Sequence, residues 1–214
     1  MSSAYGKIPK PSSAVNIDSI LPIKKTLRDN TVATLQRIDS SNIPLVQYLH
    51  ELFNGEIESG STYPQEETLS FTQFKDYFLS YDAFVLTKEL IENDKVYNYA
   101  DQVIGMYYVK PNYPGRASHI CNGGFFTSPI HRGLGAGVAL GETYLIIAPA
   151  LGYKASMFNL VFVNNEASIR IWRRLGFQEV GRVPKAARLN NCPGELVDAL
   201  MFYYDFTAEK KSSK

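Results

Sequence analysis

The chain contains few of the residues that build disulfide frameworks and metal sites. Its 214 residues include two cysteines, Cys121 and Cys192, and three histidines. Two cysteines so far apart do not supply the disulfide framework of a small secreted domain, so we expect a cytoplasmic protein and leave a mitochondrial or nuclear presence open. The histidines and cysteines show no metal-ligand spacing, and we therefore expect no metal.

The chain also lacks an excess of charge and a long apolar run. The 22 lysines and arginines balance 21 aspartates and glutamates, which leaves a net charge of +1. Without a basic stripe, we do not expect nucleic acid as a partner. Without an acidic cluster, a polybasic substrate is weakly disfavoured. No apolar stretch is long enough to span a bilayer, so we do not expect a membrane partner either.

The hydrophobic pattern predicts a mixed α/β domain at residues 29–207, between an N-terminal arm at 1–28 and a charged tail at 208–214. The arm is rich in serine, proline and lysine, and we expect it to be flexible or wrapped on the surface. Pro9 and Pro11 would break the amphipathic helix of a mitochondrial presequence. Periodicity predicts strands at 31–38, 83–90, 103–110, 117–126, 156–163, 177–183 and 196–206, and helices at 43–59, 70–79, 138–148 and 165–175.

The most informative stretch, residues 122–137, reads as a strand, a turn and a glycine-rich helix start. Gly133, Gly135 and Gly137 carry no Cβ, so the backbone there can approach a ligand closely. A helix start with free N–H groups favours an anion, most often a phosphate. The alternative is that the glycines only let a helix pack against a sheet. The stretch has no Gly-Lys-Ser/Thr of a nucleoside triphosphate loop, and no acid near Ser156 completes a dinucleotide-binding fingerprint.

The spacing Arg132-x-x-Gly135-x-Gly137 resembles the pyrophosphate motif of the GNAT superfamily of N-acetyltransferases. A second segment, from Asn165 through Trp172 to Phe177, is similar to the signature at the end of the coenzyme site in that superfamily. The resemblance implies a GNAT fold, with a central mixed sheet of about seven strands flanked by about four helices, and acetyl-CoA as co-substrate. It places these residues at the coenzyme: Phe125, Phe126, Arg132, Gly133, Leu134, Gly135, Ala136, Gly137, Asn165 and Trp172.

Trp172 stands where the superfamily usually has a tyrosine that protonates the departing thiolate. An indole N–H donates a hydrogen bond but is not a useful acid. The thiolate would then leave stabilised by a neutral donor such as the Asn165 amide, or take its proton from water. A thiol pKa near 8.5 makes this tolerable. The same substitution keeps open a different function, a non-catalytic sensor that binds acetyl-CoA.

A closer resemblance, to the fungal L-azetidine-2-carboxylate N-acetyltransferases, covers roughly residues 30–206. It rests on five segments in order: 54–60, 62–65, 110–113, 121–125 and 158–163. That family detoxifies proline analogues by acetylating the ring nitrogen, so the resemblance implies a small imino or amino acid as substrate and a role in stress protection. It implies that Asn122 and Asn159 orient the substrate as the catalytic residues, and that the substrate site comprises Asn122, Gly123, Asn159, Leu160 and Glu56.

Other roles for these residues remain open. Asn159 could be a structural amide within an apolar strand, and Asn122 a turn residue. Glu56 and Glu58 are rival bases, although two residues two apart on a helix do not share a face and solvated surface is the default. His119 is a weaker candidate base.

Cys121 is the only candidate for an acetyl-enzyme, and alternation next to Asn122 predicts that it faces the other side of the strand. Another amine, such as a polyamine or a protein terminus or lysine, is the alternative acceptor. Superfamily members often pair through their final strands, which leaves a homodimer open.

Overall fold

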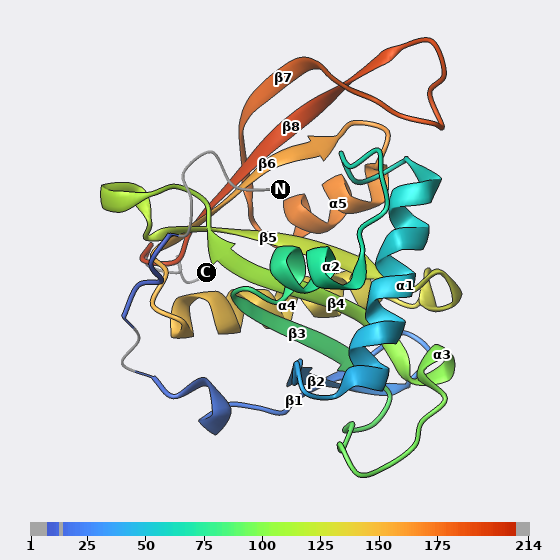
Figure 1. Cartoon of the computed structure of the whole chain (residues 1–214). Helices are drawn as coiled ribbons and strands as arrows, with labels where there is room; N and C mark the ends of the chain where they lie inside the picture. Colours follow the sequence, from blue (N-terminus) through green and yellow to red (C-terminus); the bar gives the residue numbers. More distant parts are fainter. Residues whose placement is uncertain (1–7, 13–14, 209–214) are drawn as a thin grey trace.

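The computed structural model describes residues 8–12 and 15–208 and contains one eight-stranded sheet in the order β1-β2-β3-β4-β5-β6-β8-β7 (Figure 1). Among these described strands, β5 and β6 pair in parallel and all other neighbours pair antiparallel. The strands are β1 (Ile23–Thr26), β2 (Val32–Arg37), β3 (Asp82–Thr87), β4 (Val103–Pro111), β5 (Ile120–Thr127), β6 (Ala155–Phe162), β7 (Gln178–Arg188) and β8 (Leu196–Asp205). The helices are α1 (Ile43–Ser59), α2 (Phe71–Phe78), α3 (Tyr99–Gln102), α4 (Ala136–Ala150) and α5 (Glu166–Arg174). The predicted mixed α/β fold with a central mixed sheet is confirmed.

Helices cover both faces of the sheet. One apolar cluster joins α4 and α5 to one face, around Tyr107, Leu140 and Trp172. The other joins α1 and α2 to the opposite face, around Phe53 and Tyr108. Figure 1 shows α1 and α2 in front of the sheet and the long β7–β8 hairpin projecting beyond it.

Local sequence explains where the two helices in front of the sheet begin and end. The Asn42 side chain accepts the Leu45 N–H at the start of α1, and Gly60 ends that helix with a φ of 60°. Ser70 and Gln73 form a reciprocal capping box at the start of α2. These caps fix the loop between α1 and α2, which borders the functional site.

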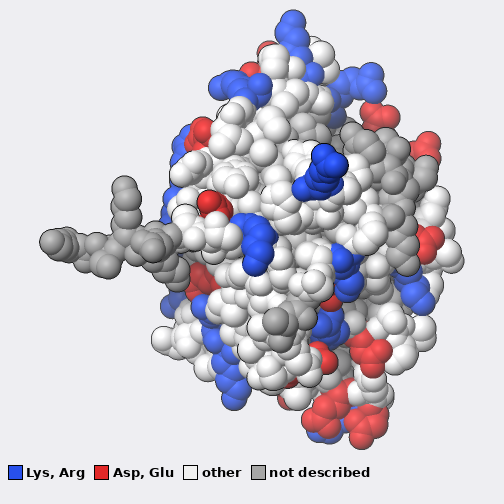
Figure 2. All heavy atoms as spheres, turned by 90° about the vertical axis from the view of Figure 1, so that its left-hand side faces the viewer, with Lys and Arg blue, Asp and Glu red and all other residues white. Residues whose placement is uncertain are grey.

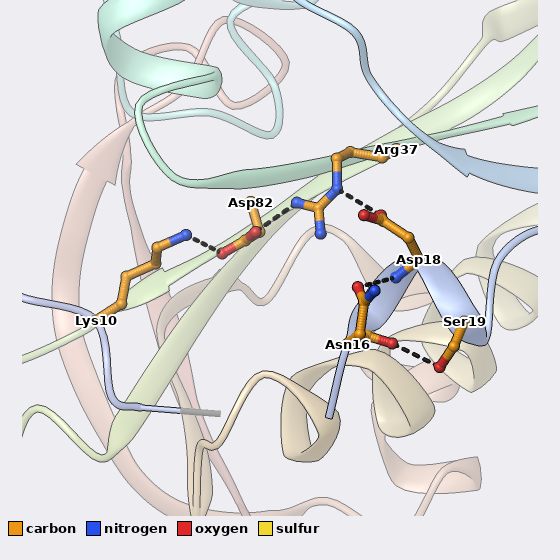
Figure 3. A network of polar contacts seen from close by, with 6 residues as sticks. All are labelled: Lys10, Asn16, Asp18, Ser19, Arg37 and Asp82. Atoms are coloured by element: carbon orange, nitrogen blue, oxygen red, sulfur yellow. Dashed lines mark hydrogen bonds and ion pairs between the residues drawn. The ribbon is translucent and has the colours of Figure 1, made fainter. Parts of the chain in front are cut away.

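The strand β1 was not predicted, because residues 1–28 were expected to form the N-terminal arm. Ile23–Thr26 pairs antiparallel with β2 along one edge of the sheet. Nearer the N-terminus of the arm, Lys10 lies 2.8 Å from the buried Asp82 carboxylate, which Arg37 of β2 also contacts at 2.5 Å. Arg37 forms a further ion pair with Asp18 of the arm (Figure 3). The arm is therefore attached to the sheet at two places. Residues 1–7 and 13–14 of the expected arm, and 209–214 of the expected tail, lie outside the described residues.

The parallel strands β5 and β6 stay together for only a short distance. Their pairing is confined to Ile120 with Ala155 and Cys121 with Ser156. Beyond these pairs the strands separate, and a bulge interrupts the pairing of β6 with β8 between Phe158 and Val161. The separation opens the middle of the sheet at Asn122 and the residues that follow it.

The described part of the chain contains no helix with the length and apolarity needed to cross a bilayer. On the face drawn in Figure 2, basic side chains are scattered among acidic and uncharged ones, so that face carries no continuous field of one sign. No group of three or more histidine, cysteine, aspartate or glutamate side chains within residues 8–12 and 15–208 is placed to hold a metal ion.

Candidate active site

A cleft of about 700 Å³ opens at the N-terminus of α4. Gly135 precedes the helix with a φ of 86°, and no side chain caps the first turn. The N–H groups of that turn are therefore free to meet a ligand, and the helix dipole adds a partial positive charge. The cleft is lined here by Arg132, Gly133, Gly135, Ala136 and Gly137, five of the residues that the resemblance places at the coenzyme.

The glycines of this loop lack a Cβ for different structural reasons. A Cβ on Gly133 would meet nothing within 4 Å, so this backbone is open to a ligand. A Cβ on Gly137 would lie 2.7 Å from Ile171, so Gly137 lets α5 pack closely against α4. Helix packing thus accounts for Gly137, whereas the space at Gly133 leaves room for the predicted approach of a ligand.

Leu134, which was also predicted at the coenzyme, is not among the lining residues of the cleft. Its side chain packs against the core, and its carbonyl accepts the Arg28 N–H at 3.0 Å. This contact brings the Arg28 side chain to the cleft from the N-terminal arm.

The cleft is strongly basic. Besides Arg132 it is lined by Arg28, Arg170 and Arg174, whereas Glu56 is its one acidic residue among the described lining. Arg170 and Arg174 are four apart on α5 and therefore project from the same side of the helix. That spacing was a readable signal for a polyanion site that the sequence analysis did not use. No comparable spacing in the sequence pointed to Arg28 as a residue of this cleft.

Glu56 occupies a position that the sequence analysis did not foresee. It exposes 8% of its surface, and its carboxylate lies 2.8 Å from the Arg132 guanidinium while also accepting the Thr62 hydroxyl. Glu56 lines the basic cleft and is not among the lining residues of the neighbouring pocket where the substrate was expected, so its substrate contact stays a prediction. It is also not the solvated residue that was the default, because it is the partner of Arg132.

A second, smaller pocket of about 230 Å³ lies where β5 and β6 separate. The predicted substrate residues Asn122, Gly123, Asn159 and Leu160 all line it. Its walls also include Tyr63, Tyr77, Tyr108, Phe125 and Phe158. None of its lining residues is an aspartate, glutamate, lysine, arginine or histidine, so the lining itself contains no carboxylate, amine or imidazole to act as a general base.

Asn159 is held by a partner that the sequence analysis missed. Asn112, just after β4, donates to the Asn159 carbonyl oxygen at 3.0 Å and accepts from the Asn159 amide at 2.7 Å. A reciprocal pair of amides fixes which atom of each group faces which way. The Asn122 side chain, in contrast, makes no hydrogen bond to another described residue and is free to meet a ligand in the pocket.

The basic cleft and the small pocket join at one wall. Thr62, Phe125, Asn165, Ser168 and Trp172 line both. The Asn165 side chain accepts the Ser168 N–H at 3.1 Å, which fixes the start of α5. A coenzyme in the cleft and a second molecule in the pocket would thus meet beside these residues.

The chain matches the sequence profile of the Acetyltransferase (GNAT) family over residues 47–177. It belongs to this family. It is 39% identical over 177 residues to N-acetyltransferase aca1 of Schizosaccharomyces pombe, covering 79% of this chain and 84% of that protein. It is 28% identical to Protein SPT10 of Saccharomyces cerevisiae, covering 89% of this chain and 37% of that longer protein.

Solved structures share the fold. A GNAT superfamily phosphinothricin acetyltransferase from Sinorhizobium meliloti, in complex with acetyl-CoA, superposes with a TM-score of 0.67 at 20% identity over 83% of this chain and 92% of its own. A GCN5-related N-acetyltransferase from Kribbella flavida gives a TM-score of 0.65 at 22% identity, with 81% and 97% covered. The chain is thus an acetyl-CoA-dependent N-acetyltransferase, and these comparisons favour the enzyme over the non-catalytic sensor.

The basic cleft of this GNAT chain fits a coenzyme that carries phosphates. Free N–H groups at the start of α4 suit a pyrophosphate, and four arginines supply the compensating charge. Phe126, predicted at the coenzyme, lines the cleft although it is 3% exposed.

Trp172, at the usual tyrosine position of the family, is mainly a packing residue. Its ring lies 4.7 Å from that of Phe125 and 4.5 Å from that of Phe158. Its indole N–H donates to the Ser168 hydroxyl oxygen at 2.8 Å. Because this oxygen accepts from Trp172, the hydroxyl hydrogen of Ser168 points elsewhere, and no described residue accepts it. Ser168 thus combines a free donor with a place on the shared wall.

The other candidate bases and nucleophiles lie away from the pocket. Cys121 is buried on the opposite face of β5 from Asn122, as alternation predicted, and contacts Tyr144 and Ala155. Burial raises the pKa of its thiol to about 12, which excludes it as an acetyl-enzyme nucleophile near neutral pH. His119 precedes β5, is exposed, and lines neither the pocket nor the cleft.

Two tyrosines of the small pocket, Tyr63 and Tyr108, remain neutral hydrogen-bonding groups. Burial raises the pKa of Tyr63 and Tyr108 well above the usual value. Tyr63 donates to the Phe125 carbonyl at 3.1 Å, which ties the loop after α1 to the central strand. The chemistry of the pocket is therefore that of amides and hydroxyls.

Proposed function

We propose that this GNAT enzyme moves the acetyl group of acetyl-CoA to the nitrogen of a small imino or amino acid, such as azetidine-2-carboxylate or another proline analogue. The observation that carries the proposal is the small pocket with amide and aromatic walls at the gap between β5 and β6. Its volume of about 230 Å³ lies below the usual range for drug-sized ligands, which suits a compact acceptor. The resemblance to the proline-analogue acetyltransferases points to the same class.

Two sets of residues bring the reactants together. Arg132 and the N–H groups of the 133–137 loop bind the coenzyme phosphates, with Arg28, Arg170 and Arg174 adding positive charge. Asn122 and Asn159 orient the acceptor in the small pocket, and Asn112 fixes the direction in which the Asn159 amide points. Orientation of this kind lowers the barrier without any proton transfer from the protein.

The proton balance follows from the absence of a carboxylate, amine or imidazole among the lining residues of the pocket. As the bond from the acceptor nitrogen to the acetyl carbon forms, the nitrogen loses its proton to water. The carbon–sulfur bond breaks, and the electron pair leaves on sulfur as a thiolate. Ser168 stabilises this thiolate with its free O–H, which the hydrogen bond from Trp172 polarises. Asn165 remains beside it as a coenzyme contact.

A peptide acceptor is the rival. A groove of about 670 Å³ between the β7–β8 hairpin and residues 57–66 shares Tyr63 and Pro64 with the small pocket. Glu58, Glu66 and Glu195 line this groove, although Arg188 pairs with Glu66 at 2.9 Å. These carboxylates lie outside the small pocket, so they favour a basic side chain only in an acceptor long enough to span both.

The test measures thiol release from acetyl-CoA with azetidine-2-carboxylate, proline, hydroxyproline isomers, lysine peptides and spermidine. We expect turnover with imino acids, with kcat/KM reduced at least roughly 10-fold in Asn122→Ala, Asn159→Ala and Asn112→Ala while acetyl-CoA affinity is kept. Asn98→Ala, at an exposed residue before α3, is the matched control. Turnover restricted to lysine peptides or spermidine would overturn the proposed substrate class.

A further inference from the structure

Lys110, on strand β4, lies beside the small pocket that we propose as the acceptor pocket. It is directly opposite Asn122 in the antiparallel pairing of β4 with β5. Residues opposite each other in such a pair project from the same face of the sheet. Lys110 and Asn122 therefore lie side by side on the face that α1 and α2 cover.

Two pocket tyrosines hold the Lys110 ammonium. Its Nζ lies 4.3 Å from the ring centroid of Tyr108 and 4.4 Å from that of Tyr77. Both tyrosines line the acceptor pocket, and their hydroxyl oxygens are 3.2 Å apart. The rings thus place a positive charge at the edge of a pocket whose lining residues carry none.

The Lys110 charge has no anionic partner in the described part of the chain, where no carboxylate lies within ion-pair distance of it. Burial lowers its pKa to about 8, a sign that the ammonium is poorly solvated. Ring faces attract a cation but do not neutralise it. A charged group that is half-buried without a counter-ion is well suited to receive one from a ligand.

We propose that Lys110 selects the acceptor, by pairing its ammonium with the carboxylate of an imino or amino acid that Asn122 also contacts. The enzyme then prefers amines that carry a neighbouring carboxylate over the same amines without one. This inference rests on the proposed function and adds the group that recognises the acid.

The test compares matched acceptors in the native enzyme and two variants. Lys110→Met keeps the length of the side chain without charge, and Lys110→Arg keeps the charge. The acceptor pairs are azetidine-2-carboxylate with its methyl ester, and proline with prolinamide. For Lys110→Met we expect KM for the acids to rise roughly 30-fold or more, and KM for the ester and amide to change less than about 3-fold. Lys110→Arg should retain much of the preference for acids.

Folding and coenzyme binding are measured in the same variants, by thermal unfolding and by calorimetry with acetyl-CoA, and both should match the native enzyme. Titration with N-acetylproline provides a readout without turnover, and its affinity should fall in Lys110→Met. An equal loss for acids and esters, or an unchanged preference for acids, would overturn the role of Lys110 and leave the proposed function standing. If the native enzyme acetylates only amines that lack a carboxylate, the proposed function would be wrong, and this inference would be wrong with it.

Discussion

The Glu56 carboxylate and the Arg132 guanidinium lie 2.8 Å apart, although 76 residues separate them in the chain. Glu56 belongs to α1 and is buried, whereas Arg132 leads into the glycine loop and is 56% exposed. Arg132 has five N–H donors, so it can hold Glu56 and still contact a phosphate. The pair therefore fixes the arginine of the coenzyme cleft to the helix that borders the acceptor side.

Loss of the ion pair between Glu56 and Arg132 should weaken the binding of acetyl-CoA. Arg132→Ala should weaken acetyl-CoA binding about 10- to 100-fold, because a charge-assisted hydrogen bond to a phosphate is lost. Glu56→Gln should weaken it by less, since the arginine remains but is no longer held. Calorimetric titration of both single variants and the double variant measures the coupling.

In the double variant, Glu56→Gln should add no further loss, because its effect acts through Arg132. Glu58→Gln, two residues further along α1, is the control and should bind as the native enzyme does. Fully additive losses would show that Glu56 does not act by positioning Arg132.

Ser168 should affect thiolate departure and not coenzyme affinity. Ser168→Ala removes the hydroxyl that we place at the leaving sulfur, so kcat should fall while the acetyl-CoA dissociation constant changes little. A donor to a thiolate lowers the thiol pKa, so its removal should raise the pKa of bound coenzyme A, measured by the ultraviolet absorbance of the thiolate.

Trp172→Phe keeps an aromatic ring but removes the indole N–H, and should produce a smaller shift of that pKa in the same direction. Ser168→Thr, which retains a hydroxyl, is the matched control. An unchanged thiol pKa in Ser168→Ala would exclude contact between this hydroxyl and the sulfur.

The two cysteines should differ in reactivity. With its pKa raised to about 12, roughly one Cys121 thiol in ten thousand is ionised at pH 8, and the side chain is fully buried. Cys192 is partly exposed. Iodoacetamide at pH 8 should label only Cys192 in the folded protein and both cysteines after unfolding. Mass spectrometry of the labelled protein measures both results. Rapid labelling of Cys121 in the native protein would contradict its position in the core.

Asp82 should stabilise the attachment of the arm. Its carboxylate is 4% exposed and is held by Lys10 and Arg37 (Figure 3). Asp82→Asn should lower the free energy of unfolding by roughly 1–3 kcal/mol, because two charge-assisted contacts are lost at a buried site. Asp18→Asn removes an exposed partner of Arg37 and should cost less than about 1 kcal/mol. Equal losses in urea denaturation of the two variants would contradict this difference.

The sequence by itself determined seven of the eight strands of the sheet, the caps of α1 and α2 and the position of the glycine loop before α4. These depend on signals between neighbouring residues: alternation, helical spacing, capping side chains and glycines before a helix. Alternation also placed Cys121 and Asn122 on opposite faces of one strand, and the structure confirms Cys121 in the core. The edge strand β1 was missed because Ile23–Thr26 is short and lies in a segment rich in proline and lysine.

Only the tertiary structure decided which distant side chains meet. Hydrophobic periodicity reports the face of an element on which a residue lies, but not the element that packs against it. The pairing of Glu56 with Arg132, of Asn112 with Asn159, and the place of Lys110 beside Asn122 all depend on strand order and register. The small pocket itself exists because β5 and β6 separate after two paired residues, and that separation is a property of the assembled sheet.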